Sequence, residues 1–378
     1  MGTLFSCCLV HIDIYKLIWV ALSSGRRSEV LREEHARRVF RPKRVLVESA
    51  ALEYPLGKKI HDMFCGTEVD VKVIPSHNRI VTERGLSARQ AYTMAKSTLV
   101  VGVRKSKKFE TCRPSADFQL PLVTSCPGMC RYCYLLTTLG RTPYVRVYVN
   151  VQEMLDIADE YARARQCELT TFEGAATGDP LAVEEYTRAL ANAIEHFGKC
   201  SHARFRFVSK FAAVDSLLEL EHARHTEIRF SVNAREVIRL YEQGTDTLTA
   251  RLDAAAKAAV ADYPVGFMVA PIIVFDGWEA AYERLFGLIQ RYSQHTEALQ
   301  TATFELVTHR FTPRAKARVL ELFEDAHPDM EESSRKFIFG QFGYGKYVYE
   351  QDTMQRISAL FDRLLRDYMP KARRLYLV

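Results

Sequence analysis

The sequence has no low-complexity tract, no fixed-period repeat and no long apolar segment free of charged residues. These absences argue against solenoids, disordered linkers and integral membrane proteins. The nine cysteines are odd in number and unevenly spread, which argues against a disulfide framework. Because 48% of the 378 residues are hydrophobic, the chain can bury one large core or two moderate ones. We expect a globular protein of the reducing cytoplasm, without a membrane partner.

The N-terminal segment differs from the rest of the chain. Residues 3–23 are rich in Leu, Ile, Val and Cys, but His11, Asp13 and Lys16 interrupt the run. The segment is too short and too polar for a membrane span, and it lacks the basic start and cleavage site of a secretory signal. We expect residues 1–38 to be a poorly ordered extension, or the product of a start codon placed too far upstream.

The net charge of +6 is modest, and a basic run between residues 26 and 44 contributes to it. Such a run can contact phosphates or can simply be solvated. We favour the solvated face, because basic runs are not specific to nucleic acid. The charge alone neither requires nor excludes a polyanionic partner.

Strand-like and helical segments alternate along most of the chain. Strands expected at 45–47 and 69–74 flank a helix at 55–64, which predicts a small α/β module over residues 39–110. Further expected strands are residues 145–151, 169–173, 205–209, 228–232, 265–274 and 303–307, and the expected helices are 151–165, 181–197, 251–261 and 278–292. Parallel strands need long connections, usually helices. We therefore predict an α/β fold with a partial (β/α)6 TIM-like barrel over residues 111–330.

Three cysteines, Cys126, Cys130 and Cys133, lie close together in the sequence. Three thiolates can hold an iron–sulfur cluster or a zinc ion, and either would keep one metal position open. From spacing alone, a zinc knuckle completed by His77 or His202 stays an alternative. Cys126 follows an apolar run at 120–123, which predicts a place at the C-terminal ends of the barrel strands, where parallel barrels carry their chemistry.

Other polar residues follow the expected strands in the same way. If those strand ends meet at one face of a barrel, these side chains share a pocket with the cysteines. The candidates are Thr177, Asp179, Ser209, Lys210, Ser231, Asn233, His309 and Arg310.

The cysteine spacing, with Tyr132 before the last cysteine, resembles the cluster motif of the radical S-adenosylmethionine superfamily. Within it, the chain from about residue 39 onward resembles the spore photoproduct lyase family. The resemblance rests on residues 53–57, 95–104, 133–135, 137–140, 143–146, 148–150, 266–267, 269–271, 309–312 and 345–349. It implies a 4Fe–4S cluster on Cys126, Cys130 and Cys133, with S-adenosylmethionine bound to the open iron. It also implies a C-terminal hairpin and helix, here residues 331–378.

The resemblance implies a DNA repair reaction. An electron from the cluster cleaves a carbon–sulfur bond of S-adenosylmethionine, and the resulting 5′-deoxyadenosyl radical takes a hydrogen atom from spore photoproduct, a methylene-bridged thymine dimer (5-thyminyl-5,6-dihydrothymine). The bridge breaks, a hydrogen atom is returned, and two thymines result. The implied partners are damaged DNA and an electron donor such as a flavodoxin or a ferredoxin, and we expect a monomer.

The family's functional residues carry over incompletely. The resemblance implies cofactor contacts for Tyr132, Gly178, Lys210, Ser231 and Ala270, with Gly178 in place of a serine. It implies catalytic positions at Tyr132 and Tyr134, of which Tyr134 takes part in hydrogen transfer. The position of the family's hydrogen-donating cysteine is Ala176, whose methyl group cannot give up a hydrogen atom as a thiol does. The nearest thiol in the sequence is Cys167, which we interpret as a small apolar residue.

The DNA-wedging hairpin of the family also changes in this chain. Gln341 and Phe342 replace an Arg-Tyr pair, before Tyr344 and Lys346, so the aromatic wedge remains and a charge for a phosphate is lost. Two alternatives therefore stay open. One is a family member that acts on a different substrate, and the other is a non-catalytic, zinc-containing nucleic-acid-binding protein.

Overall fold

The computed structural model describes residues 38–81, 84–165, 168–294, 296–325, 327–339, 343 and 345–378. The expected extension before residue 38, together with Cys167, Gln341, Phe342 and Tyr344, lies outside this described part. No helix within the described ranges is long and apolar enough to cross a bilayer.

The N-terminal module is built on a five-stranded sheet in the order β2-β1-β3-β8-β6. Runs of valine and leucine bury β1 and β3 at its centre, where the two strands pair in parallel. Helix α4 starts with a capping box formed by Ser87 and Gln90. The elements are β1 (Arg44–Glu48), η1 (Ser49–Glu53), α3 (Pro55–Phe64), β2 (Asp70–Ile74), α4 (Ala88–Lys96), β3 (Thr98–Gly102), β6 (Val123–Thr124) and β8 (Val145–Tyr148).

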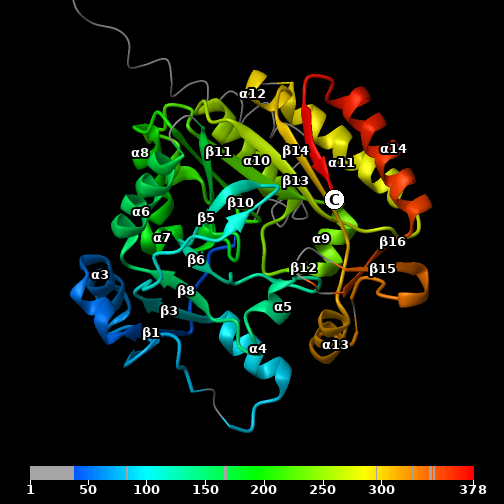
Figure 1. Ribbon diagram of the computed structural model, residues 1–378. Helices are drawn as coiled ribbons and strands as arrows, with labels where there is room; N and C mark the ends of the chain where they lie inside the picture. The colour runs from blue at the N-terminus through cyan, green and yellow to red at the C-terminus, as the bar shows by residue number, and fades with distance from the viewer. Residues whose placement is uncertain are drawn as a thin grey trace, which may run out of the picture. The chain divides into compact units, whose positions relative to one another are not determined.

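The main domain is a curved eight-stranded sheet in the order β17-β14-β13-β11-β10-β9-β5-β4 (Figure 1). Its strands are parallel from β5 through β17, and only β4 pairs in the antiparallel sense. Its strands are β4 (Thr111–Cys112), β5 (Ala116–Leu120), β9 (Thr170–Gly174), β10 (Ala203–Ser209), β11 (Thr226–Val232), β13 (Val265–Ile272), β14 (Thr303–Thr308) and β17 (Arg373–Leu377). The six strands β5, β9, β10, β11, β13 and β14 give the predicted partial barrel.

Helices cover the outer side of this sheet (Figure 1). The helical segments of the main domain are α5 (Leu135–Thr138), α6 (Val151–Ala164), η2 (Pro180–Val183), α7 (Glu184–Thr187), α8 (Ala189–Gly198), η3 (Asp215–Leu217), α9 (Arg235–Tyr241), α10 (Leu248–Val260), α11 (Trp278–Ser293), α12 (Glu297–Gln300), α13 (Pro313–Leu322), η4 (Glu332–Ser334) and α14 (Gln351–Tyr368). The C-terminal hairpin consists of β15 (Arg335–Phe339) and β16 (Gly345–Tyr349). Two further short strands, β7 (Met129–Cys130) and β12 (Glu242–Gln243), pair with each other.

Two expected elements are corrected by the structure. The strand expected at 145–151 is β8, which pairs with β3 in the N-terminal sheet, and β5 takes its place in the barrel. The helix expected at 181–197 is broken at Arg188, whose φ is 51°. There the Glu184 carboxylate accepts hydrogen bonds from the backbone N–H groups of Leu190 and Ala191, at 2.8 and 2.9 Å, and so caps α8. Strand β17 was not expected.

Charged side chains occupy the interior of the barrel. Arg229 is fully buried and pairs with Glu173 and Glu305, with 2.5 Å between Arg229 Nη1 and Glu305 Oε2. Arg206 pairs with Glu305 at 2.9 Å. Buried charges are tolerated only when they are paired, so these residues depend on one another.

The Arg229→Met variant is expected to lose about 3–5 kcal/mol of unfolding free energy, because two buried carboxylates lose their shared cation. Urea denaturation checks this. The matched control is Arg284→Met, which breaks a 2.7 Å pair with Glu236 on the surface and is expected to cost about 1 kcal/mol or less. Equal losses in the two variants would show that the buried network does not hold the barrel together.

Candidate functional site

The cysteine loop runs from β6 to α5 and is held in place at three points. Cys130 pairs with Glu242 where β7 meets β12. Ser125, with φ of 65°, donates its N–H to the Thr177 carbonyl at 2.7 Å. The buried ammonium of Lys96 donates to the Cys126 carbonyl at 2.8 Å. The loop backbone is therefore fixed before any metal binds.

The sulfur atoms of Cys126 and Cys130 both lie near Gly128. A β-carbon at Gly128 would lie 3.5 Å from the Cys126 sulfur and 3.9 Å from the Cys130 sulfur, so the missing side chain leaves room between them. Burial raises the pKa of both thiols, an effect that Lys96 opposes at Cys126 and Lys210 opposes at Cys130. Thiols in such surroundings ionise when they bind a metal, because the metal stabilises the thiolate.

The zinc hypothesis requires a histidine close to the three cysteine sulfur atoms. Ligands of one tetrahedral zinc ion, at about 2.3 Å from the metal, would place sulfur atoms about 3.8 Å apart. The sulfur atoms of Cys126, Cys130 and Cys133 do not all lie within 4.8 Å of one another, nor do they form such a group with His77 or His202. His77 instead contacts Glu48 at 2.7 Å, and His202 is exposed. Within the described residues, neither histidine is therefore placed to complete a zinc site with the three cysteines.

Four of the predicted cofactor residues meet at Lys210. Its ammonium donates to Ser231 Oγ at 2.8 Å, to the Tyr132 hydroxyl oxygen at 3.1 Å and to the Ala270 carbonyl at 3.3 Å. These residues come from different strand ends and from the cysteine loop, so the barrel brings them together as the resemblance implies.

Two further residues of this group were not predicted. The buried Glu242 pairs with Lys210 at 2.8 Å and with Arg251 at 2.7 Å, and it accepts a hydrogen bond from Tyr132. Burial alone would raise the pKa of Glu242, but Lys210 and Arg251 lower it to about 2, so the carboxylate stays charged. No sequence motif marks Glu242 or Arg251, because their roles arise from the pairing of β7 with β12 and from the start of α10.

The loop after β9 packs directly on the cysteine loop. Gly178 forms a β-bridge with Ser125, and a β-carbon at Gly178 would lie 2.6 Å from the Ser125 carbonyl oxygen. A serine would therefore require this backbone to shift. The Tyr134 hydroxyl donates to the Ala176 carbonyl at 2.5 Å, which places the two residues of the expected hydrogen transfer in contact.

Asp179 joins this loop to the end of β10. Its carboxylate accepts from Ser209 Oγ and from the Lys210 N–H, both at 2.8 Å. Burial raises the pKa of Asp179 to about 6. Asn233 has a structural role instead, since it donates to the Pro271 carbonyl at 2.7 Å and accepts from Tyr282 at 2.9 Å.

The segment that follows β14 lies against the C-terminal hairpin. His309 is buried, and burial lowers its pKa to about 3, so it is neutral at physiological pH. Phe311 forms an antiparallel β-bridge with Tyr347, and Arg310 on one side of it lies close enough to Lys346 to act on its charge. Burial lowers the pKa of Lys346, and the positive charge of Arg310 lowers it further.

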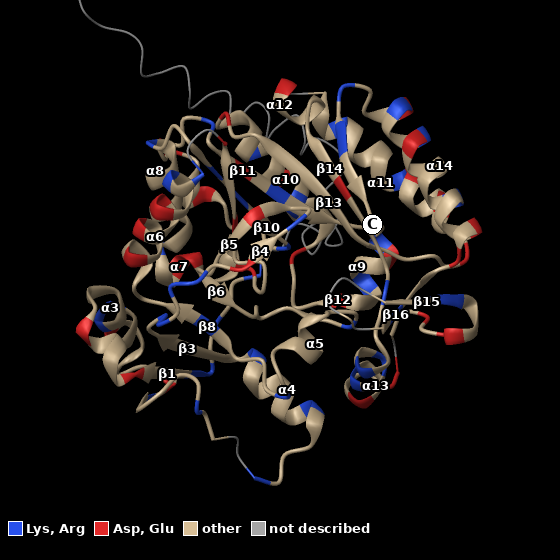
Figure 2. Cartoon of the chain, viewed as in Figure 1, with Lys and Arg blue, Asp and Glu red and all other residues tan. Residues whose placement is uncertain are grey.

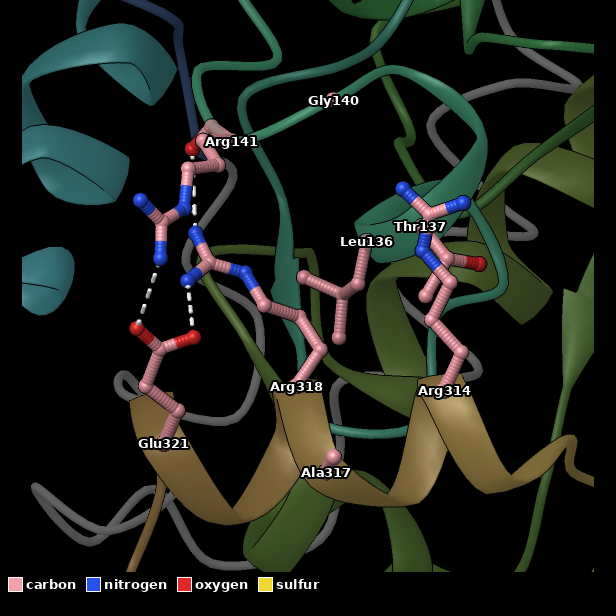
Figure 3. A pocket seen from close by; sticks show the side chains of 8 residues that line it. All are labelled: Leu136, Thr137, Gly140, Arg141, Arg314, Ala317, Arg318 and Glu321. Atoms are coloured by element: carbon pink, nitrogen blue, oxygen red, sulfur yellow. Dashed lines mark hydrogen bonds and ion pairs between the residues drawn. The ribbon is translucent and has the colours of Figure 1, made fainter.

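A cavity of 470 Å³ lies next to the cysteine loop, between α5 and α13 (Figure 3). Arg318 donates to the Arg141 carbonyl at 3.0 Å and pairs with Glu321 at 2.5 Å. The side chain of Arg314 extends toward Thr137 (Figure 3). Figure 2 shows several Lys and Arg residues on α13, the helix that borders this cavity. The cavity is lined by Leu136, Thr137, Gly140, Arg141, Arg314, Ala317, Arg318 and Glu321.

Comparison with known proteins agrees with this geometry. The family model described as "Spore photoproduct lyase" matches residues 40–378. The chain belongs to the spore photoproduct lyase family. It is 41% identical over 334 residues to a spore photoproduct lyase of Bacillus subtilis (strain 168), which covers 88% of this chain and 97% of the relative. It is 42% identical over 333 residues to one from Geobacillus sp., with 88% and 97% covered.

Solved structures of this family have the same fold. A variant spore photoproduct lyase with bound S-adenosylmethionine and dinucleoside spore photoproduct gives a TM-score of 0.87 at 41% identity, and covers 90% of this chain and 99% of that one. A lyase in complex with the dinucleoside photoproduct gives the same TM-score at 40% identity and covers 90% and 99%. The predicted fold class and the family resemblance are confirmed. The roles of individual site residues stay predictions.

Proposed function

We propose that this chain is a radical S-adenosylmethionine lyase that converts spore photoproduct in DNA to two thymines. The observation that carries the proposal is the three-cysteine loop at the strand ends, packed beside the group of Tyr132, Lys210, Ser231 and Ala270. Identity to spore photoproduct lyases over nearly the whole of their length supports the same reaction.

In this proposal, Cys126, Cys130 and Cys133 hold a 4Fe–4S cluster, and the residues around Lys210 contact S-adenosylmethionine. Gly178 contributes only its backbone. Bound together, the two groups supply one-electron cleavage of a carbon–sulfur bond and abstraction of a hydrogen atom. The electron comes from a partner protein such as a flavodoxin or a ferredoxin, and we infer a monomer of the cytoplasm.

In this proposal, the chain's own residues position these groups. Glu242 stays ionised and fixes the ammonium of Lys210 through a 2.8 Å ion pair. The same carboxylate orients the Tyr132 hydroxyl. Tyr134 donates its hydroxyl to the Ala176 carbonyl, and in this proposal it takes part in the return of a hydrogen atom to the product.

The test is anaerobic reconstitution with iron and sulfide, followed by incubation with S-adenosylmethionine, a reductant and DNA that carries the photoproduct. We expect a coloured protein, formation of 5′-deoxyadenosine and restored thymines. A colourless protein would contradict the proposal that the chain binds an iron–sulfur cluster. The proposed substrate would be wrong if this chain and the Ala176→Cys variant both cleave the cofactor but neither repairs thymines.

Ala176 supports a second candidate function, a family member that acts on another substrate. A position that carries a methyl group in place of a thiol suits a reaction whose product radical is quenched by a different donor. The outcome with photoproduct DNA separates this function from the first.

We also propose that DNA phosphates lie along the basic face formed by Arg141, Arg310, Arg314 and Lys346. Arg141 is 85% exposed, and Arg314 borders the cavity beside α5. Neutralisation of phosphates by such side chains releases counterions and makes binding dependent on salt. A flipped lesion at the barrel mouth would need its flanking phosphates held on this face.

The Arg314→Gln variant is expected to weaken DNA binding and to lower the slope of log K against log salt by about 0.9, the value for one lost phosphate contact in duplex DNA. Fluorescence anisotropy at several salt concentrations measures this slope. Arg291→Gln, at an exposed position on α11, is the matched control and should leave the slope unchanged. If the two variants give the same slope, the DNA phosphates do not contact Arg314.

A further inference from the structure

Three potential metal ligands meet on the outer side of the barrel, between α6 and α8. The His196 Nε2 atom lies 3.0 Å from Asp159 Oδ1, and the Cys200 sulfur lies 3.7 Å from the same oxygen. All three ligand atoms lie within 4.8 Å of one another, and within the described ranges no other group of three such residues does. The cluster cysteines belong to a different part of the fold.

We propose that Asp159, His196 and Cys200 bind a divalent metal ion, zinc by preference. Nitrogen, carboxylate oxygen and sulfur are the donors that zinc accepts, at about 2.0–2.3 Å from the metal. Donor atoms around one tetrahedral zinc ion are about 3.3–3.8 Å apart, so the observed separations need little adjustment. The histidine and aspartate side chains are 18% and 35% exposed, so solvent can deliver the ion and supply a water as the fourth ligand.

The local fold holds the ligands in this arrangement. His196 and Cys200 are four residues apart at the end of α8, which brings both to one side of that helix end. Gly198 lets the helix end pack tightly, because a β-carbon there would lie 2.3 Å from the Glu221 carbonyl oxygen. Asp159 comes from the middle of α6, so two neighbouring helices supply the set.

A simple ion pair between Asp159 and His196 would explain the contact between these two side chains. It would not explain why the Cys200 thiol also lies beside them. Cys200 already donates to the His196 carbonyl at 3.3 Å and needs no further acceptor, yet its sulfur also faces the carboxylate oxygen that the imidazole contacts. The three ligand atoms lie within 4.8 Å of one another, close enough for one ion to take the place of the proton-mediated contacts. A bound ion would clamp α6 to α8, the helices on either side of β9 along the chain.

The experiment uses the reconstituted protein with its cluster in place, dialysed against buffered zinc and analysed for zinc and iron by mass spectrometry. We expect about one zinc ion per chain, and X-ray absorption at the zinc edge should show one sulfur ligand at about 2.3 Å. Zinc held by the cluster cysteines would instead show three sulfur ligands and displaced iron, and would overturn the proposal.

Variants of the proposed ligands test whether the zinc ion binds at this site. Cys200→Ser and His196→Gln are each expected to lower zinc retention at least roughly tenfold, with unchanged iron content as the check that the chain is folded. Cys65→Ser, at an exposed cysteine elsewhere, is the matched control and should retain zinc. Zinc should raise the Tm of the unaltered chain and of the control only. Absence of zinc, or equal retention by all variants, would contradict the proposal.

Discussion

The Cys130→Ala variant is expected to lose the iron–sulfur cluster and, with it, all measurable cleavage of S-adenosylmethionine. Cys130 is the buried member of the three cysteines, and its backbone pairs with Glu242, so the lost thiolate cannot be replaced by a shift of the loop. Two remaining thiolates leave two irons of a 4Fe–4S cluster without protein ligands. Iron and sulfide content, visible absorbance and the yield of 5′-deoxyadenosine measure the loss.

The matched control is Cys65→Ala, which removes an exposed thiol that lies after α3 and outside the loop. It should keep its iron and its activity. Alanine at position 130 preserves the β7–β12 pairing, so the variant is expected to fold and to keep its far-ultraviolet circular dichroism. A Cys130→Ala protein that still binds four irons and cleaves the cofactor would show that the cluster is held elsewhere.

The cysteines could be predicted from sequence because their chemistry depends on short spacing along one loop. The same holds for Lys210, which directly follows β10, and for Ser231, the next-to-last residue of β11, because such positions reach the strand-end face of a parallel barrel. In each case a local pattern carries the information. The structure brings Lys210 and Ser231 to within 2.8 Å of each other, as the barrel prediction requires.

The role of Glu242 could not be predicted, because no motif or periodic pattern in the adjacent sequence marks it as a functional residue. It sits in a two-residue strand whose partner is more than a hundred positions away, and only that pairing places its carboxylate between Lys210 and Arg251. Long-range pairing of this kind leaves no periodic signal in the sequence.

The errors in the fold have a similar origin. Residues 145–148 are rich in β-branched and aromatic side chains and were correctly expected as a strand, but such composition does not say which sheet a strand joins. Leu99 in β3 is the partner of Val145. Strand β5 was missed because Asp117 and Gln119 interrupt its apolar pattern. The Asp117 carboxylate accepts the Thr171 N–H at 3.0 Å, so the polar residue belongs to the strand pairing itself. Strand β17 begins with two arginines and was missed for the same reason.

The Ala176→Cys variant is expected to raise the number of thymines repaired per S-adenosylmethionine consumed by at least roughly tenfold, which corresponds to about 1.4 kcal/mol. A thiol gives up a hydrogen atom readily, whereas a methyl group does not. Position 176 lies beside Tyr134, whose hydroxyl donates to the Ala176 carbonyl at 2.5 Å, so a thiol there is expected to be near the tyrosine of the proposed hydrogen transfer. The measurement compares restored thymines with 5′-deoxyadenosine in the two proteins.

Two further variants separate hydrogen donation from a change of shape. Ala176→Ser adds a side chain of similar size whose O–H bond is much stronger than S–H, so it should not improve the repair yield. Tyr134→Phe in the Ala176→Cys background should reduce the gain if the tyrosine passes the hydrogen atom on, and leave it intact if the thiol acts directly. Should the serine variant improve repair as much as the cysteine variant, the position would act through packing. Hydrogen return in this chain would then depend on a donor other than residue 176.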